Sequence, residues 1–152
     1  MDRPGSSALT FTSLSALVPT TITTVISNPT QQAPPSQTLG PGGVTVECPG
    51  ADNTIYTVPG TTQVFRRQCG INYGAVDGAV DVQGATKSSM GDCLALCAKY
   101  NINIETTKRG CVGVTWVYIG PQGTQYNFCW IKSALGNITY FDNNESAVLL
   151  KA

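Results

Sequence analysis

The sequence predicts an α+β domain in which one α-helix packs on an antiparallel β-sheet. Three observations point to this class: one stretch with helical spacing of apolar residues, several short β-branched and aromatic runs between turn residues, and six cysteines. At 152 residues the chain is long enough for one core and too short for two. The 16 glycines and 9 prolines together with the cysteines indicate an oxidised, turn-rich module.

The helix is expected at residues 89–100. Ser89 stands three residues before Asp92, which is a variant of the capping box that begins many helices. Four residues recur at spacings of three and four, and so share one helical face: Met90, Cys93, Leu94 and Cys97. Both cysteines of this helix are therefore expected to point into the core.

Strands are expected on both sides of the helix. The turn dipeptide Pro59-Gly60 joins residues 55–58 to residues 63–69, which indicates a hairpin. Residues 70–87 are rich in glycine and small side chains and are predicted to form a loop. Three further runs have the composition of strands: residues 111–118, 125–132 and 146–150. Along the second of these runs, Cys129 and Phe128 fall on opposite faces.

Residues 1–43 differ in composition from the rest of the chain. They contain 20 Ser, Thr or Pro residues, only two charges and no cysteine. Such a segment buries too little apolar surface to offset the entropy of ordering it, so we expect a disordered stalk or linker. An O-glycosylated stalk and an unmodified linker both fit this composition. The folded domain is predicted to span residues 44–152.

The N-terminus lacks the basic region and the unbroken apolar core of a signal peptide. No window holds the 18 or so apolar residues of a transmembrane helix, so membrane insertion by this segment is not expected. If the cysteines are oxidised, the chain is expected to belong to a longer precursor that is secreted or anchored at the cell surface.

The charge composition restricts the classes of partner and chemistry. Nine basic and nine acidic residues give a net charge of zero, which argues against nucleic acid as a partner. The chain has no histidine, so imidazole-based catalysis and histidine-containing zinc sites are excluded. No nucleophile–base constellation is evident, and we therefore expect no enzyme activity, no cofactor and no metal site.

The six cysteines admit two interpretations. The Cys93-x-x-x-Cys97 spacing is compatible with a zinc site, but such sites in short domains usually carry two cysteine pairs, or one pair with histidines. Here the other four cysteines are scattered singly, at positions Cys48, Cys69, Cys111 and Cys129. Disulfides are favoured, and six cysteines permit 15 pairings among which spacing alone does not choose.

Three segments resemble the core of the PAN/apple domain: residues 92–98 (DCLALCA), 111–116 (CVGVTW) and 128–133 (FCWIKS). The sequence is most similar to the single-copy form found in fungal extracellular and cell-surface proteins. The opening Cys48-Pro49 and the ending ESAVLL at residues 145–150 extend the resemblance to about residues 46–150.

The resemblance implies a helix joined to the central sheet by the disulfides Cys93–Cys129 and Cys97–Cys111. Cys48 and Cys69 then remain to pair with each other. Apple domains of animal proteins commonly join their first and last cysteines, and this chain departs from that pattern because no cysteine follows Cys129.

Candidate ligand-binding residues lie in two places. Tyr118 and Tyr126 flank the turn between two predicted strands and are expected to be exposed, where aromatic rings stack on sugars or anchor protein partners. Lys108 and Arg109 form a basic pair after the helix that suits an acidic partner or a sulfated glycan. The remaining aromatic residues of these strands are expected to pack in the core: Trp116, Phe128 and Trp130.

Asn137 and Asn144 begin N-glycosylation motifs, which predicts a glycoprotein. The resemblance implies a non-catalytic extracellular module that binds a protein or carbohydrate partner. The alternative is a structural protein that self-assembles in a wall, matrix or surface fibre, because near-zero net charge favours self-association.

Overall fold

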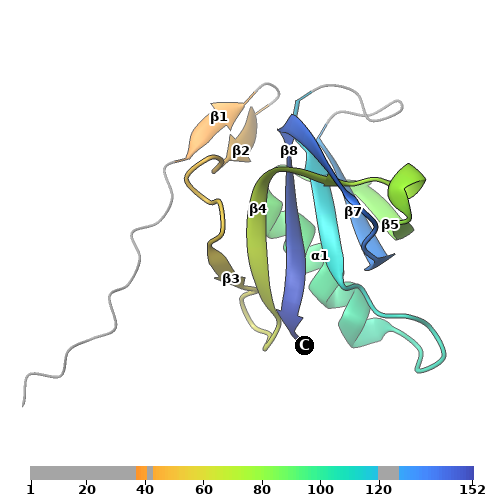
Figure 1. The fold of residues 1–152 in the computed structure, drawn as a ribbon. Coiled ribbons are helices and arrows are strands. Elements are labelled where there is room, and N and C mark those ends of the chain that lie inside the picture. The colour runs from red at the N-terminus through yellow and green to blue at the C-terminus, as the bar shows by residue number, and fades with distance from the viewer. Residues whose placement is uncertain (1–36, 41–42, 120–126) are drawn as a thin grey trace, which may run out of the picture. The chain divides into compact units, whose positions relative to one another are not determined.

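The structure, a computed structural model, describes residues 37–40, 43–119 and 127–152 (Figure 1). A six-stranded antiparallel sheet has the strand order β3-β4-β8-β6-β7-β5, and α1 packs on one of its faces. A second sheet contains β1 and β2 alone. The elements are β1 (Thr38–Gly40), β2 (Val44–Val46), β3 (Ile55–Thr57), β4 (Val64–Tyr73), η2 (Ala75–Asp77), β5 (Val80–Thr86), α1 (Met90–Asn103), β6 (Gly113–Val117), β7 (Phe128–Ala134) and β8 (Ile138–Lys151). The predicted α+β class is confirmed.

Helix α1 begins where the capping pattern predicts. The backbone N–H of Asp92 donates a hydrogen bond of 3.1 Å to the Ser89 hydroxyl, which satisfies one of the otherwise unpaired amides of the first turn. The helix ends three residues later than predicted, at Asn103. Its buried face contains the four predicted residues and one more: Met90, Cys93, Leu94, Cys97 and Ala98.

The core lies between α1 and the centre of the sheet. Trp116 on β6 and Ile131 on β7 are fully buried in it, as predicted for Trp116. The other face of β6 is covered as well, because the second half of β4 crosses it (Figure 1). There the Tyr73 backbone N–H donates to the Thr115 hydroxyl at 3.3 Å. All five residues of β6 are therefore buried.

The loop predicted for residues 70–87 is wrong. Strand β4 continues to Tyr73, η2 follows, and β5 pairs with β7 at the edge of the sheet. Register shifts between Val80 and Gln83 interrupt the two-residue alternation that would identify a strand. Two aromatic rings pack so closely against residue 84 that only glycine fits there. A Cβ atom at Gly84 would overlap the Phe128 ring and lie 2.9 Å from the Trp130 ring.

Two other boundaries differ from expectation. Thr38–Gly40 forms a strand that pairs with Val44–Val46, so ordered structure begins before the predicted boundary at residue 44. The expected closing strand at 146–150 is part of the longer β8, which starts at Ile138. Its first half contains Asp142 and neighbouring asparagines, which are residue types depleted in strands. The sequence therefore does not predict this half, which forms because it pairs with other strands in the folded chain. The predicted stalk is otherwise outside the described residues.

All six cysteines are paired, which overturns the zinc interpretation. The bonds are Cys48–Cys69, Cys93–Cys129 and Cys97–Cys111, with Cα–Cα distances of 5.7, 5.6 and 5.6 Å. These are the pairings that the resemblance implies. Two of them join α1 to β7 and to the residue that leads into β6, and the third joins the segment after β2 to β4.

Replacing Cys97 and Cys111 together by alanine is expected to lower the free energy of unfolding by about 3 kcal/mol. This is the chain-entropy estimate for a loop of this size, which spans a sequence separation of 14. Urea unfolding without reductant measures the change. The exposed helix substitution Ala95→Ser is the control, with an expected effect within about 0.5 kcal/mol. A double variant as stable as this control would contradict the prediction.

Candidate functional site

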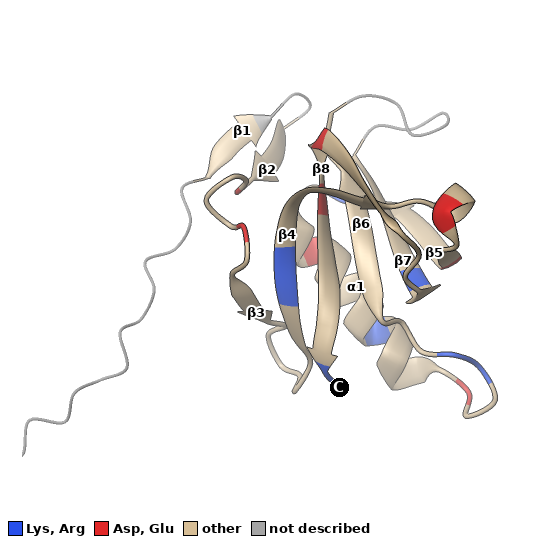
Figure 2. Cartoon of the chain, viewed as in Figure 1, with Lys and Arg blue, Asp and Glu red and all other residues tan. Residues whose placement is uncertain are grey.

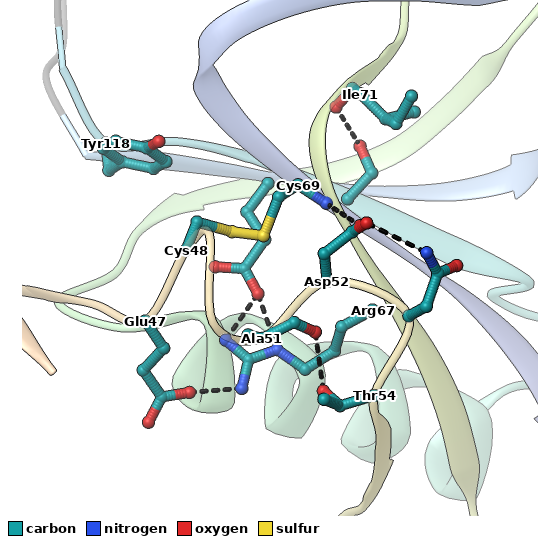
Figure 3. Close-up of a disulfide and its surroundings, with 12 residues drawn as sticks. Glu47, Cys48, Ala51, Asp52, Thr54, Arg67, Cys69, Ile71 and Tyr118 are labelled. Carbon is teal, nitrogen blue, oxygen red and sulfur yellow. Dashed lines mark hydrogen bonds and ion pairs between the residues drawn. A yellow bond between two sulfur atoms is a disulfide. The ribbon is translucent and has the colours of Figure 1, made fainter. Parts of the chain in front are cut away.

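A charged cluster of the buried Arg67 and Glu145 and the partly exposed Glu47 lies beneath the Cys48–Cys69 disulfide (Figure 3). Arg67 Nε donates to Glu145 Oε1 at 2.6 Å, and Arg67 Nη1 donates to Glu47. Arg67 and Glu145 are buried, so solvent and ligands do not reach this pair. Two carboxyl groups therefore share one guanidinium, and that of Glu47 is partly exposed.

Burial is the main influence on how Glu145 titrates. Burial raises the pKa of its carboxyl to about 7, and the nearby Glu47 carboxylate adds to the increase, whereas Arg67 opposes it. Oxygen Oε2 of Glu145 has no hydrogen-bond partner within the described part of the chain.

The cluster serves a structural purpose. It holds residues 47–54 against β4, where the Asn53 N–H donates to the Arg67 carbonyl at 2.9 Å. The Cys69 N–H donates to Asp52 Oδ1 at 2.9 Å in the same place (Figure 3). A closed cluster of this kind aligns chain segments and presents no surface to a partner.

An open hollow of about 310 Å³ lies between the C-terminal half of α1, the loop after it and β5, and we call it the α1–β5 groove. Leu96, Tyr100 and Ile104 recur every four residues and line it with half-buried apolar surface. Its other lining residues are polar or charged: Gln83, Lys99, Asn103, Glu105 and Lys108.

The charge of the groove is positive on balance. Lys99 and Lys108 contribute two ammonium groups against the single carboxylate of Glu105. Lys108 Nζ lies 3.4 Å from Glu105 Oε2, but the Lys108 side chain is 60 % exposed, so water screens the pair and it contributes little. Figure 2 shows basic segments on α1 and on the loop after it, with an acidic segment between them. Lys108 is therefore accessible to an anionic group of a ligand.

Two aromatic side chains of β7 cover the face of β5 that is opposite the groove. Phe128 and Trp130 lie with their ring centroids 4.6 Å apart, and both rings extend over Gly84. Both side chains are half-buried, so they pack at the sheet edge instead of in the central core. The edge strand is thus bordered by aromatic rings on one side and by the α1–β5 groove on the other.

The predicted ligand-binding residues occupy different environments. Lys108 lines the groove, and Arg109 is exposed beside it in sequence. Tyr118 is only 7 % exposed, so its predicted exposure is wrong. Its backbone N–H donates to the Asn143 carbonyl and its hydroxyl donates to the Asp142 carbonyl at 2.7 Å, which holds the ring beside Trp116. Tyr126 is outside the described residues.

Sequence reasoning missed the apolar floor of the groove. The spacing of Leu96, Tyr100 and Ile104 is a second apolar stripe on the helix, and it continues past the predicted helix end at residue 100. Gln83 was not identifiable, because it lies in the segment predicted as a loop.

The two glycosylation motifs differ in accessibility. Asn137 is exposed in the connection between β7 and β8, and it remains a predicted acceptor. Asn144 is 4 % exposed and lies in β8 opposite Val117 of β6. The folded strand leaves no room for a glycan on that side chain, so we retain Asn137 alone.

Within the described ranges, no three His, Cys, Asp or Glu side chains come together as metal ligands. No described helix combines the length and the apolar character needed to cross a membrane. No protein-family model, curated protein or solved structure matches the chain.

The Glu145 carboxyl predicts a characteristic pH dependence of stability. Its pKa is about 7 in the folded protein against an ordinary value of 4.5, so between these values the folded state binds more protons than the unfolded state. This group therefore lowers the free energy of unfolding as pH rises from about 4.5 to 7, by on the order of 3 kcal/mol.

Glu145→Gln removes this titration, so the stability of the variant is expected to fall less over that range than that of the wild type. Urea unfolding at several pH values measures both curves. The exposed Glu105→Gln substitution is the control and is expected to keep the wild-type slope. Parallel curves for wild type and Glu145→Gln would refute the assignment.

Proposed function

We propose that the chain is a non-catalytic extracellular recognition module of the PAN/apple type that binds a protein or carbohydrate partner through the α1–β5 groove. The observation that carries this proposal is the groove itself, which combines an apolar floor with two accessible lysines. Binding sites on proteins typically join apolar surface with a few polar groups that orient the ligand.

The PAN/apple assignment is supported by three sequence segments and by the disulfide pattern. Residues 92–98, 111–116 and 128–133 carry the resemblance, and they supply both ends of the Cys93–Cys129 and Cys97–Cys111 bonds. An extracellular location is supported by the three disulfides, which persist in oxidising compartments.

The groove residues favour binding over catalysis. Tyr100 and Leu96 offer apolar area that a partner would remove from water, and the amides of Gln83 and Asn103 offer donors and acceptors. Glu105 is the single carboxylate among the lining residues, and it faces Lys108. Acid–base catalysis by paired carboxylates would need a second one.

Self-assembly into a wall, matrix or surface fibre is the second candidate, and a different surface favours it. Tyr140 is 81 % exposed and Phe141 is 56 % exposed on β8, and Ile138 and Ile119 are exposed as well. Ile119 and Phe141 line one hollow of about 210 Å³. Apolar side chains that gather at the surface are typical of protein–protein contacts.

Binding through the groove predicts sensitivity to two substitutions. The full chain is tested on arrays of extracellular proteins and of glycans, and the strongest interaction is then measured in solution. Lys108→Glu and Tyr100→Ala are each expected to weaken it about tenfold or more, because one reverses a charge and the other removes an aromatic contact. Lys151→Glu makes the same charge change outside the groove and is expected to have no effect. An interaction that all three variants retain would refute the groove as the site.

Self-assembly predicts a change of molecular mass with concentration. Light scattering after size exclusion is expected to show a monomer at every concentration if recognition is the function. Concentration-dependent polymers that the double substitution Tyr140→Ser and Phe141→Ser abolishes would support the second candidate.

A further inference from the structure

The hollow of about 210 Å³ that Ile119 and Phe141 line is on the face of the sheet opposite α1. Val117 lines it too, and because Val117 follows the core residue Trp116 in β6, its side chain points to that opposite face. We call this hollow the β8 bulge site. Its remaining lining residues are all polar: Asn72, Asp142, Asn143 and Asn144. It shares no lining residue with the α1–β5 groove.

The hollow forms where β8 bulges away from β4. On β4, only Gly70 lies between the partners of Tyr140 and Glu145. Residues 141–144 therefore stand opposite a single residue and form a wide bulge. Gly70 has a φ of +67°, a left-handed conformation that glycine adopts readily. Bulges redirect side chains out of the regular alternation of a strand and are frequent beside functional sites. Here the bulge brings consecutive side chains to one hollow.

Tyr118 holds the bulge in place. Its hydroxyl donates to the Asp142 carbonyl at 2.7 Å, and its backbone N–H donates to the Asn143 carbonyl at 3.1 Å. The Tyr118 ring is buried beside Trp116, so the bulge is attached to the core of the domain. The backbone that carries the lining side chains is thus positioned before a ligand arrives, which lowers the entropic cost of binding.

Asn144 provides a buried amide without a partner. The residue is 4 % exposed, and its side chain makes no hydrogen bond within the described part of the chain. Buried polar groups usually have partners, because an unpaired group has lost its hydrogen bonds to water without replacement. Since Asn144 lines the hollow, a ligand bound there can supply the missing acceptor and donor.

The other polar groups of the hollow extend this pattern. Asn72 Nδ2 donates to the Thr139 hydroxyl at 3.3 Å, which leaves the amide oxygen of Asn72 as an acceptor. Asn143 is exposed and offers a second complete amide. An amide presents a donor and an acceptor side by side, and neighbouring hydroxyl groups match it because each hydroxyl both donates and accepts.

The apolar and charged residues narrow the ligand further. Phe141 is 56 % exposed, so its ring is available to pack against the apolar face of a sugar. Asp142 is the single charged residue among the lining residues. Its carboxylate accepts hydrogen bonds from hydroxyl groups and repels an anionic ligand. The charge of this hollow is therefore opposite to that of the α1–β5 groove.

We propose that the β8 bulge site binds a neutral hexose unit of a glycan. The amides of Asn143 and Asn144 bind neighbouring ring hydroxyls, Asp142 accepts a hydrogen bond from a further hydroxyl, and Phe141 packs against the ring. A bound sugar has to present only a hydroxyl to Asn144, whereas a covalently attached glycan would need space around the amide itself. The proposal adds a second site to the recognition role and does not depend on the α1–β5 groove.

The test is a titration of the full, disulfide-intact chain with the methyl glycosides of glucose, galactose and mannose, followed by NMR. At least one of the three is expected to shift the side-chain amide signals of Asn143 and Asn144 in a saturable manner. Methyl glucuronide differs from methyl glucoside by a carboxylate, and it is expected to bind at least about tenfold more weakly than the best neutral glycoside.

Two neighbouring aromatic residues provide a matched pair of variants. Tyr140 is more exposed than Phe141, but it does not line the hollow. Phe141→Ala is expected to weaken the glycoside at least about tenfold, and Tyr140→Ala is expected to leave its affinity unchanged. Asn144→Ala is expected to weaken it to a similar extent, with the backbone amide spectrum verifying the fold. Asn143→Ala makes the same test at an exposed position if Asn144→Ala does not fold.

Three results would each overturn the proposal: no saturable shift with any of the neutral glycosides, shifts that leave residues 141–144 unchanged, or equal weakening by Phe141→Ala and Tyr140→Ala. A peptide that shifts the same amides when no glycoside does would assign the hollow to a protein partner and would also overturn it. Lys108→Glu is expected to leave the glycoside titration unchanged, so failure of this site and failure of the α1–β5 groove are distinguishable.

Discussion

Cys93 and Cys97 lie one turn apart on the same face of α1 and bond to two different parts of the sheet. Each bond alone would leave the helix free to rotate about one attachment. Together they fix its position along β7 and at the start of β6, with the Trp116 indole buried in the same core. The groove beside β5 exists because this attachment sets the distance between the helix and the sheet edge.

The attachment also determines which parts of the helix remain accessible. The face with both cysteines is used entirely for the core, so Leu96, Tyr100 and Ile104 are left at the side toward β5. They are half-buried there. The helix thus has two apolar stripes, of which one packs in the core and the other lines the α1–β5 groove.

A different part of the fold shows why burial does not by itself indicate a site. The Arg67–Glu145 pair has the most perturbed carboxyl in the described structure, yet it is closed to solvent and connects residues 47–54 to β4. Removing Arg67 would leave the buried Glu145 carboxyl without its cation, so the pair is constrained to persist once it has formed. Lys99 and Lys108, in contrast, are exposed at the groove.

The sequence by itself determined the class, the helix and its cap, and the face that Cys93 and Cys97 share, because these depend on local spacing and capping chemistry. The disulfide pairing followed from a resemblance, since spacing alone permits 15 arrangements. Only the tertiary structure decided that Tyr118 is buried, because its backbone bonds to β8. The same holds for residues 70–87, where β5 forms by pairing with β7. Strand β5 has register shifts and a glycine under two aromatic rings, so its sequence lacks the alternation of apolar and polar residues that identifies a strand. This strand and the groove beside it are therefore evident only in the folded chain.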